Sequence, residues 1–465
     1  MNAKKNILLL TTGGTIASVL GGEGLEPQRS AVMERELNQL RTYYNIAVED
    51  VMCLDSSNMQ PEQWQTIARH VFERKDAFDG IVISHGTDTM AYSASAVTFM
   101  LPNIDVPVVF TGSQLPLADI LSDGPDNLRT AFAMAASGTP GVFLAFDRKV
   151  MLGCRAVKVR ASGFSAFESI NARYAGKVSN QGLVLDPQVL PKAKGAPAFL
   201  PQISQNVFLL KLTPGLNPKV FDMLAAMGYK GIVVEAFGLG GINVLQKGLS
   251  GIQRAIEDGI SVVVTTQCLY DSSDLNVYQV GNKLLQLGVI QGRDMTSEAA
   301  MTKLMWVIGQ GMTQTQIAAL FTQNLAGEIT LPGEREVPMD KFAAEVKEKW
   351  GKTEAYAEHA QKTKDYSKEK QAALAGSLDA IMAEFSRCRE HSPESEEAQA
   401  LVAKLQAHIT ENYYTCTPAI LAGLGQMYVA DGRFKQNIDR HGEGTAQFIC
   451  DAILAFCQET KYGTI

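Results

Sequence analysis

The sequence predicts an α/β protein with a larger, doubly wound parallel-sheet domain, a smaller α/β domain and a C-terminal all-α domain. Short apolar runs alternate with longer amphipathic segments up to about residue 330, which is typical of βαβ units around a parallel sheet. Residues 190–197 carry Pro, Lys and Gly without periodicity and indicate a linker. Beyond residue 338 the apolar residues recur only at helical spacing. We therefore expect domains over residues 1–190, 205–335 and 340–465.

The first strand of the predicted sheet covers residues 7–10 and opens into the sequence TTGGTIA at residues 11–17. A short apolar run bounded by turn residues suits an interior strand, and ligands of open α/β folds bind beyond the carboxyl ends of such strands. We therefore expect Thr12 and Thr15 to face a crevice. The glycine pair alone would equally suit a simple turn from a strand into a helix.

A second strand, residues 80–84, ends in a similar way, in the sequence HGTDT at residues 85–89. Each intervening helix of a doubly wound sheet returns the chain to the same edge, so the two polar strand ends are expected to lie side by side. Asp88 alone would also suit a helix cap. Further strands are predicted at residues 108–111 and 142–145, and helices at residues 30–42 and 61–74.

Two later regions complete the predicted architecture. Strands at residues 207–212, 231–235 and 262–265, each followed by a helix, form the smaller α/β domain, which closes with a helix through Leu304. The glycines at residues 238–241 lack the spacing of a dinucleotide-binding fingerprint. In the C-terminal region we expect a helix capped by Ser392, a helical face formed by Leu401, Leu405 and Ile409, and further helices at residues 418–429 and 445–456.

Composition and charge exclude several classes of function. The net charge of −7 provides no electrostatic attraction to nucleic acid. No apolar run approaches the roughly 20 residues that cross a bilayer, and the run behind Lys4 and Lys5 is too short for a signal peptide. Seven cysteines without C-x-x-C spacing and six histidines without ligand spacing indicate neither a disulfide framework nor a metal site. We expect a cytoplasmic protein without metal, cofactor, nucleic-acid or membrane partners.

The sequences TTGGTIA and HGTDT together resemble the pair of signature motifs of the bacterial asparaginase/glutaminase family. The sequences DSSNM at residues 55–59, TGSQ at residues 111–114 and SDG at residues 122–124 are especially similar to the cytoplasmic type I asparaginases. The resemblance extends from residue 5 to about residue 333. It implies hydrolysis of L-asparagine to aspartate and ammonia, with glutamine as a minor substrate, by a homodimer or homotetramer.

The resemblance also implies the roles of individual residues. Thr15 attacks the side-chain amide, ammonia leaves, and water cleaves the acyl-enzyme. Thr87 matches the second catalytic threonine and Lys158 the catalytic lysine, with Asp88 beside them. Lysine is protonated in water at neutral pH, so a role as base requires surroundings that favour the neutral amine, whereas Asp88 favours the charged form. The positions that hold the substrate are matched by Ser56, Ser57, Thr87 and Asp88.

One position departs from the family pattern. The glycine-rich sequence GGEG at residues 21–24 predicts a flexible lid, although it would also suit a solvent loop. Many family members carry a lid tyrosine after these glycines, where this chain has Leu25. A leucine cannot form a hydrogen bond. Either another group assists Thr15, such as Tyr43 or Tyr44 if the loop aligns differently, or turnover is slower or differently selective.

The C-terminal region resembles a second family. The sequences EKWGKTEAY at residues 348–356, YSK at residues 366–368 and MY with DGRF between residues 427 and 434 are similar to the TipA-type drug-recognition (TipAS) domain. That family implies a small globin-like helical module that binds thiopeptides or other bulky antibiotics in a groove. The chain lacks the DNA-binding helix-turn-helix of such regulators. The region would alternatively serve only for packing or oligomerisation.

Two other functions are alternatives to the amidohydrolase. One is an antibiotic-binding protein whose α/β part is a weak or repurposed enzyme, although Thr15, Thr87, Asp88 and Lys158 are all present. The other is a subunit that frees ammonia for a tRNA-bound substrate. Such subunits usually carry an extra N-terminal domain, and we do not expect one here because the first motif starts at Ile7.

Overall fold

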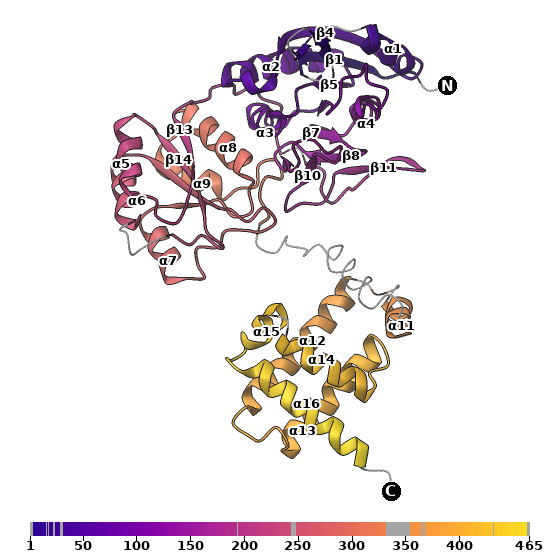
Figure 1. Cartoon of the computed structure of the whole chain (residues 1–465), viewed down its shortest axis with the longest axis vertical. Coiled ribbons are helices and arrows are strands. Elements are labelled where there is room, and N and C mark those ends of the chain that lie inside the picture. Colours follow the sequence, from indigo (N-terminus) through magenta and orange to yellow (C-terminus); the bar gives the residue numbers. More distant parts are fainter. Residues whose placement is uncertain are drawn as a thin grey trace. The chain divides into compact units, whose positions relative to one another are not determined.

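The computed structural model describes residues 3–14, 16, 18–21, 24–27, 31–192, 194–242, 248–331, 354–363, 366, 368–430 and 432–462. The chain divides into two compact units, Met1–Arg335 and Glu336–Ile465. The first unit contains two α/β lobes, and the described part of the second is helical (Figure 1). The predicted fold class is therefore confirmed.

The first lobe is built on an eight-stranded sheet in the order β12-β11-β8-β7-β6-β5-β1-β4. Its strands are β1 (Asn6–Gly13), β4 (Asn45–Leu54), β5 (Gly80–Ser84), β6 (Pro107–Thr111), β7 (Gly141–Phe146), β8 (Lys149–Leu152), β11 (Gly176–Ser179) and β12 (Gly182–Leu185). Strands β4, β1, β5, β6 and β7 are parallel. All of them except β4 were predicted. Strands β8, β11 and β12 extend the sheet in antiparallel fashion, which was not predicted.

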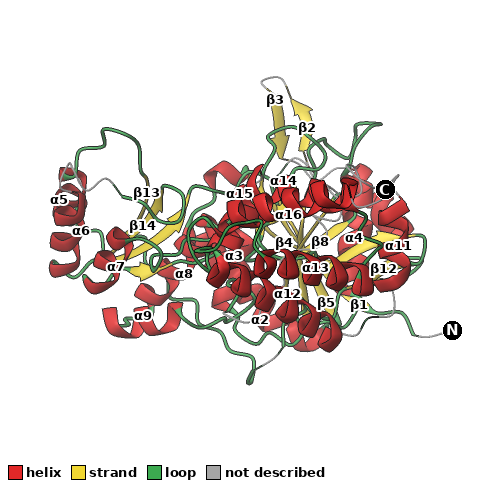
Figure 2. Cartoon of the chain, turned by 90° about the horizontal axis from the view of Figure 1, so that it is seen from below, coloured by secondary structure: helices red, strands yellow, loops and turns green. Residues whose placement is uncertain are grey.

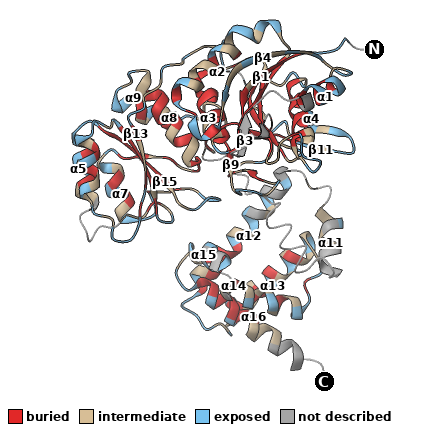
Figure 3. Cartoon of the chain, turned by 45° about the horizontal axis from the view of Figure 1, so that its top comes forward, coloured by how far each residue is buried: buried red, intermediate tan, exposed pale blue. Residues whose placement is uncertain are grey.

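The parallel strands β1, β5, β6 and β7 are buried on both faces, whereas β4, at the edge of the sheet, is partly exposed. Leu9 of β1 lies in register with Val48 and Val82, and Val82 lies in register with Val109 of β6. Helices α2 and α3 cover one face of the sheet and α1 and α4 the other (Figure 1), and the strands between them are largely buried (Figure 3). These helices are α1 (Ala31–Leu40), α2 (Pro61–Arg74), α3 (Met90–Met100) and α4 (Gly124–Ala135). Burial on both sides explains why the strands are continuous apolar runs rather than alternating ones.

Helix α2 begins and ends at the predicted residues. Pro61 occupies its first turn, and Gln60 and Gln63 form a reciprocal capping box. Trp64 and Val71 lie on its buried face. Local capping and an amphipathic pattern therefore suffice to place this helix.

The glycine-rich segment after β1 includes the ends of two paired strands, which were not predicted. β2 (Ser18–Gly21) pairs antiparallel with β3 (Gly24–Pro27), so that Gly21 lies opposite Gly24 and Leu20 opposite Leu25. Figure 2 shows the hairpin projecting from the lobe. Gly22, Glu23 and the side chain of Leu25 lie outside the described part of the structure.

The second lobe has a four-stranded parallel sheet in the order β13-β14-β15-β16. Its elements are β13 (Val207–Lys211), α5 (Lys219–Ala226), β14 (Gly231–Ala236), α6 (Gly248–Glu257), β15 (Ser261–Thr266), α7 (Gln279–Gln286), β16 (Ile290–Gln291), α8 (Ser297–Gly309) and α9 (Gln314–Phe321). The three predicted strands and the helix through Leu304 are present. Helix α8 packs on α3 of the first lobe, where the rings of Trp306 and Phe99 stack with centroids 6.2 Å apart.

The helical unit contains α11 (Glu354–Thr363), α12 (Lys368–Cys388), α13 (Glu396–Asn412), α14 (Pro418–Ala430), α15 (Gly432–Asp439) and α16 (Thr445–Tyr462). Leu405 and Ile409 are buried in its core, with Leu401 packed against them, as predicted. The predicted cap is wrong, because the hydroxyl of Ser395, not Ser392, accepts a hydrogen bond from the Ala398 amide. Ser392 instead accepts from Glu394 in the preceding turn.

Candidate active site

The carboxyl ends of β1 and β5 meet through glycines. Gly13 and Gly14 have φ angles of 99° and 84°, in the left-handed region that favours glycine. A Cβ atom on Gly14 would lie 2.4 Å from the Gly86 nitrogen, and one on Gly86 would lie 2.6 Å from the Ser56 hydroxyl. The glycines of both motifs therefore allow three chain segments to approach within backbone contact, as expected for two polar strand ends that share one edge.

Three of the predicted residues form a hydrogen-bonded group at this edge. Lys158 Nζ donates to Thr87 Oγ1 at 2.9 Å and to Asp88 Oδ1 at 2.6 Å. Thr87 and Asp88 follow β5, whereas Lys158 ends β9 (Ala156–Lys158), which pairs with β10 (Phe167–Ser169). The Thr87 side chain is buried, while the Asp88 side chain is 63% exposed. Because this carboxylate is so exposed to solvent, it can bind a second cation while it holds Lys158.

Ser56 lies beside this group. It is buried in the short 3-10 helix Ser56–Asn58, and its carbonyl oxygen accepts a hydrogen bond from Thr89 Oγ1 at 2.7 Å. Asp55 caps the helix by accepting from the Ser57 amide at 2.9 Å and the Ser57 hydroxyl at 2.5 Å. Ser57 thus stabilises the turn that carries Ser56.

The structure corrects two expectations about hydroxyl groups. Thr12 does not face a crevice, because it is 1% exposed and its hydroxyl donates to the Ser84 carbonyl at 2.9 Å. This hydrogen bond ties the side chain to the end of β5, inside the sheet. Thr15 lies outside the described residues.

Tyr43 and Tyr44 lie at the edge of the sheet opposite to Gly13. Tyr43 is 71% exposed and Tyr44 packs on Phe132, directly before β4. The first residue of β4 lies opposite Asn6, whereas its last lies opposite Gly13. At about 3.3 Å per residue, the two ends of β4 are roughly 30 Å apart.

A glutamine that the sequence alone did not single out completes the group. Gln114 follows β6, the next strand along the sheet, and its Oε1 accepts from Thr87 Oγ1 at 3.1 Å. Its backbone amide donates to both oxygens of Asp123, at 3.0 and 3.1 Å. The sequences TGSQ and SDG carried the signal for this residue, since they place polar residues at a third strand end of the same edge.

His85 cannot supply charge to the site. It is fully buried, and burial lowers the pKa of its imidazole to about 4, despite the bond at 2.7 Å from Nδ1 to the Gly86 carbonyl oxygen. The ring is therefore neutral at physiological pH. The titratable side chain that the described residues place within hydrogen-bonding distance of Thr87 is Lys158.

The strand that carries Lys158 is anchored to the second lobe. Arg155, 1% exposed, donates to the Asp294 carboxylate at 3.2 Å, to the Asp294 carbonyl at 2.9 Å and to the Gly327 carbonyl at 2.6 Å. Asp294 also accepts from the Thr330 hydroxyl at 2.6 Å. A buried guanidinium with this many partners fixes the start of β9, three residues before Lys158.

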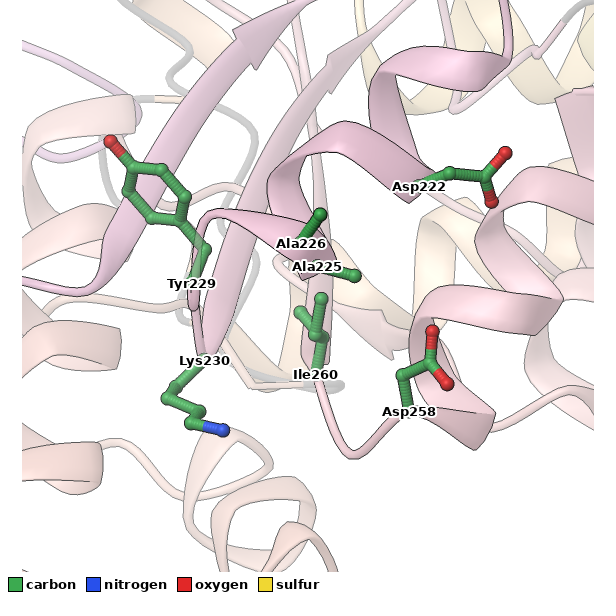
Figure 4. Close-up of a pocket in the computed structure, with 7 residues that line it drawn as sticks. All are labelled: Asp222, Ala225, Ala226, Tyr229, Lys230, Asp258 and Ile260. Atoms are coloured by element: carbon green, nitrogen blue, oxygen red, sulfur yellow. The ribbon is translucent and has the colours of Figure 1, made fainter.

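A separate pocket of about 370 Å³ lies in the second lobe and is shown in Figure 4. Its lining residues are Asp222, Ala225, Ala226, Tyr229, Lys230, Asp258 and Ile260. Lys230 and Ile260 directly precede β14 and β15, so the pocket lies at the amino edge of the parallel sheet. Ligands of open α/β sheets bind at the opposite edge, and we assign no function to this pocket.

The described residues contain no group of three or more His, Cys, Asp or Glu side chains placed to hold a metal ion. Within the same part of the chain, no helix is long and apolar enough to span a membrane.

Comparisons with known proteins match three regions of the chain to family models. Residues 6–190 match the family model described as "Asparaginase, N-terminal", and residues 206–321 match "Glutaminase/Asparaginase C-terminal domain". Residues 342–456 match "TipAS antibiotic-recognition domain".

Individual relatives cover the two lobes. An L-asparaginase of Thermococcus kodakarensis is 43% identical over 328 residues, which are 70% of this chain and 99% of that protein. A solved structure of the thermostable L-asparaginase from Thermococcus kodakarensis gives a TM-score of 0.66 at 42% identity, over 70% of this chain and 100% of that one.

L-asparaginase 1 of Escherichia coli K12 is 36% identical, over 70% of this chain and 98% of the relative. A component of the glutamyl-tRNA(Gln) amidotransferase of Methanobrevibacter smithii is 34% identical, over 70% of this chain and 77% of its own length. The chain therefore belongs to the asparaginase family, and a TipAS domain follows its two asparaginase domains.

Proposed function

We propose that the protein hydrolyses the side-chain amide of L-asparagine to aspartate and ammonia. The observation that carries this proposal is the position of Lys158, whose ammonium bridges the Thr87 hydroxyl and the Asp88 carboxylate at the glycine-lined strand ends. Two relatives that cover both lobes are named L-asparaginases. Ammonia release from L-asparagine and L-glutamine by the full-length chain tests the proposal. Release from asparagine with equimolar aspartate supports it, and no release from either amide contradicts it.

The proposed reaction uses Thr15 as the nucleophile. Its hydroxyl oxygen attacks the amide carbon, the carbon–nitrogen bond breaks, and the departing amine takes the proton and leaves as ammonia. Water then cleaves the aspartyl ester and restores the hydroxyl. Thr87 and Lys158 move protons in these steps.

Asp88 is placed to hold the substrate as well as Lys158. Asp88 holds the Lys158 ammonium at 2.6 Å and is open to solvent. The α-ammonium of asparagine would bind the same carboxylate from its exposed side. Ser56, at the adjacent chain segment, would hold the α-carboxylate.

Leu25 is expected to limit turnover. A leucine on the β2–β3 hairpin offers no hydrogen bond to Thr15, whereas the tyrosine common in the family does. We expect Leu25→Tyr to raise kcat for asparagine, and Leu25→Phe, which adds only the ring, to raise it less. Steady-state ammonia release measures both variants. Unchanged kcat and KM in Leu25→Tyr would contradict a role for this position.

The TipAS match supports a second candidate function for the helical unit, recognition of a bulky peptide antibiotic. A ligand that binds only the folded state stabilises it by about 2.7 kcal/mol at a concentration of 100 Kd. We expect a thiopeptide to raise the melting temperature of the full-length chain with increasing concentration. A thermal-shift titration without any effect would contradict this function. Stabilisation together with no amide hydrolysis would favour a binding protein whose enzymatic part is repurposed.

We propose further that the protein acts in the cytoplasm as a homodimer or homotetramer, as its resemblance to type I asparaginases implies. Sedimentation velocity of the full-length chain would measure the assembly. A monomer at all concentrations would contradict it.

A further inference from the structure

The side-chain amide of Gln114 both donates and accepts hydrogen bonds. Its Nε2 lies 3.0 Å from the Ala161 carbonyl oxygen and 3.2 Å from the Gly163 carbonyl oxygen. Its Oε1 lies 3.1 Å from Thr87 Oγ1. Carbonyl oxygens only accept hydrogen bonds, so the end of the amide that faces Ala161 and Gly163 must be the NH₂ group. The oxygen is therefore fixed toward Thr87.

This orientation determines where the Thr87 proton lies. A hydroxyl has one hydrogen to donate, and it can accept at its lone pairs. The Lys158 ammonium can only donate and Gln114 Oε1 can only accept, so the hydrogen of Thr87 points to Gln114 and a lone pair points to Lys158. The chain of bonds runs in one direction, from Lys158 through Thr87 to Gln114.

We propose that Gln114 is a positioning residue for catalysis, which holds the Thr87 side chain so that its hydroxyl oxygen stays within hydrogen-bonding distance of Lys158. This inference rests on the proposed amide hydrolysis. Without the acceptor at Gln114, the Thr87 side chain loses one of the two hydrogen bonds that hold it, and its oxygen lies within reach of Lys158 for only part of the time. The consequence is a slower chemical step with substrate binding retained, because Ser56 and Asp88 do not contact Gln114 through any bond that the described residues show.

Hydrogen bonds from neighbouring residues fix the backbone of Gln114, as its proposed positioning role requires. The Asp123 carboxylate accepts from the backbone amides of Gln114 and Leu115 at 3.0 to 3.1 Å. Asn127 donates to the same carboxylate at 3.0 Å and to the Gly112 carbonyl at 2.9 Å. The backbone on both sides of Gln114 is thus fixed by a buried asparagine and its carboxylate partner. Supporting hydrogen bonds of this kind maintain the geometry of a functional group.

Two variants separate the positioning role from a purely structural one. Gln114→Met removes both the acceptor for Thr87 and the donors to Ala161 and Gly163. Gln114→Glu also removes the donors but keeps an acceptor for Thr87. Gln310→Met is the matched control, because Gln310 Nε2 donates to the Gln202 carbonyl at 2.7 Å and the Leu200 carbonyl at 3.5 Å, at the end of α8.

The readouts are kcat and KM for asparagine and the melting temperature of the full-length chain. We expect Gln114→Met to lower kcat by about 10- to 100-fold, with KM changed less than about twofold. We expect Gln114→Glu to retain more of the kcat than Gln114→Met, even if it lowers the melting temperature further. Gln310→Met should keep the wild-type kcat.

Three results would overturn the inference. They are a kcat of Gln114→Met within about twofold of wild type, a Gln114→Glu enzyme slower than Gln114→Met, or a rise in KM as large as the fall in kcat. Failure of the proposed function looks different, because the wild-type chain would then release no ammonia from asparagine and Thr15→Ala would change nothing. The inference about Gln114 would then be wrong as well, because it depends on amide hydrolysis.

Discussion

Replacing Lys303 by methionine is expected to lower the free energy of unfolding of the asparaginase part by about 3–5 kcal/mol. Lys303 of α8 and Glu328 form an ion pair at 2.5 Å, and both side chains are 0% exposed. The ammonium also donates to the Gln323 carbonyl at 3.2 Å and lies over the Phe321 ring. Methionine preserves the length of the side chain but leaves the Glu328 carboxylate buried without its cation.

The pH dependence of this penalty follows from the environment of Glu328. Burial alone would raise the pKa of its carboxyl, but Lys303 and the backbone amides of Ala326 and Leu325 together lower it. In the wild type the carboxylate therefore contributes stability at neutral pH that is lost as the pH falls. In Lys303→Met burial is opposed only by the two amides, so we expect the carboxyl to bind a proton more readily when folded. The penalty should be larger at about pH 7.5 than at about pH 5.

Urea unfolding followed by tryptophan fluorescence measures the effect. Trp64 and Trp306 are buried in the first unit, and a Trp350→Phe background removes the third tryptophan. Lys283→Met, at an exposed position of α7, is the control and should stay within about 0.5 kcal/mol of wild type. Adding Glu328→Gln to Lys303→Met should restore part of the stability, because no isolated charge then remains. A single variant within about 1 kcal/mol of wild type would show that the ion pair is not needed.

Lys158→Met is expected to lower kcat for asparagine by about 10²- to 10⁴-fold. The variant removes the group that joins Thr87 and Asp88, at 2.9 and 2.6 Å, while its length and apolar stem are retained. Binding should weaken less than turnover, since Ser56 and Asp88 remain in place. Initial rates of ammonia release at saturating asparagine measure the loss.

Lys5→Met provides the control for this experiment. Lys5 also pairs with an aspartate, Asp79, at 2.8 Å, but it precedes β1 and so lies at the opposite edge of the sheet. We expect this variant to keep the wild-type kcat. Loss of activity in both variants would indicate a general effect of charge removal, and activity of Lys158→Met within tenfold of wild type would exclude Lys158 from proton transfer.

The parallel strands β1, β5, β6 and β7 of the first lobe were predictable because they are buried on both faces. The parallel strand β4 was not predicted, and it is partly exposed at the edge of the sheet. Continuous apolar runs such as residues 80–84 carry a signal that does not depend on register. The antiparallel strands β11 and β12 have only four residues each and mixed exposure, so they give no clear period. The cap of α13 failed for a related reason, since Ser392 and Ser395 offer equal chemistry and only the packing of Ala398 and Val402 selects between them.

The candidate site also contains residues that were predictable from the sequence and residues that were not. Thr87, Asp88 and Lys158 were predictable from a family resemblance, and the structure brings their side chains together. The burial of Thr12 was not, because it depends on the hydrogen bond that its hydroxyl makes to the Ser84 carbonyl of the neighbouring strand. Gln114 belongs to a motif that the sequence shows, but its role was not predictable, because its importance depends on the neighbour that its amide oxygen contacts.

The central claim, amide hydrolysis with Thr15 as nucleophile, is tested most directly by ammonia release from L-asparagine in the wild-type chain and in Thr15→Ala at equal protein concentration. The account predicts steady release by the wild type and a loss of at least about 10³-fold in the variant, with an unchanged melting temperature. Release by Thr15→Ala at the wild-type rate would contradict it, because the ammonia would then come from another nucleophile.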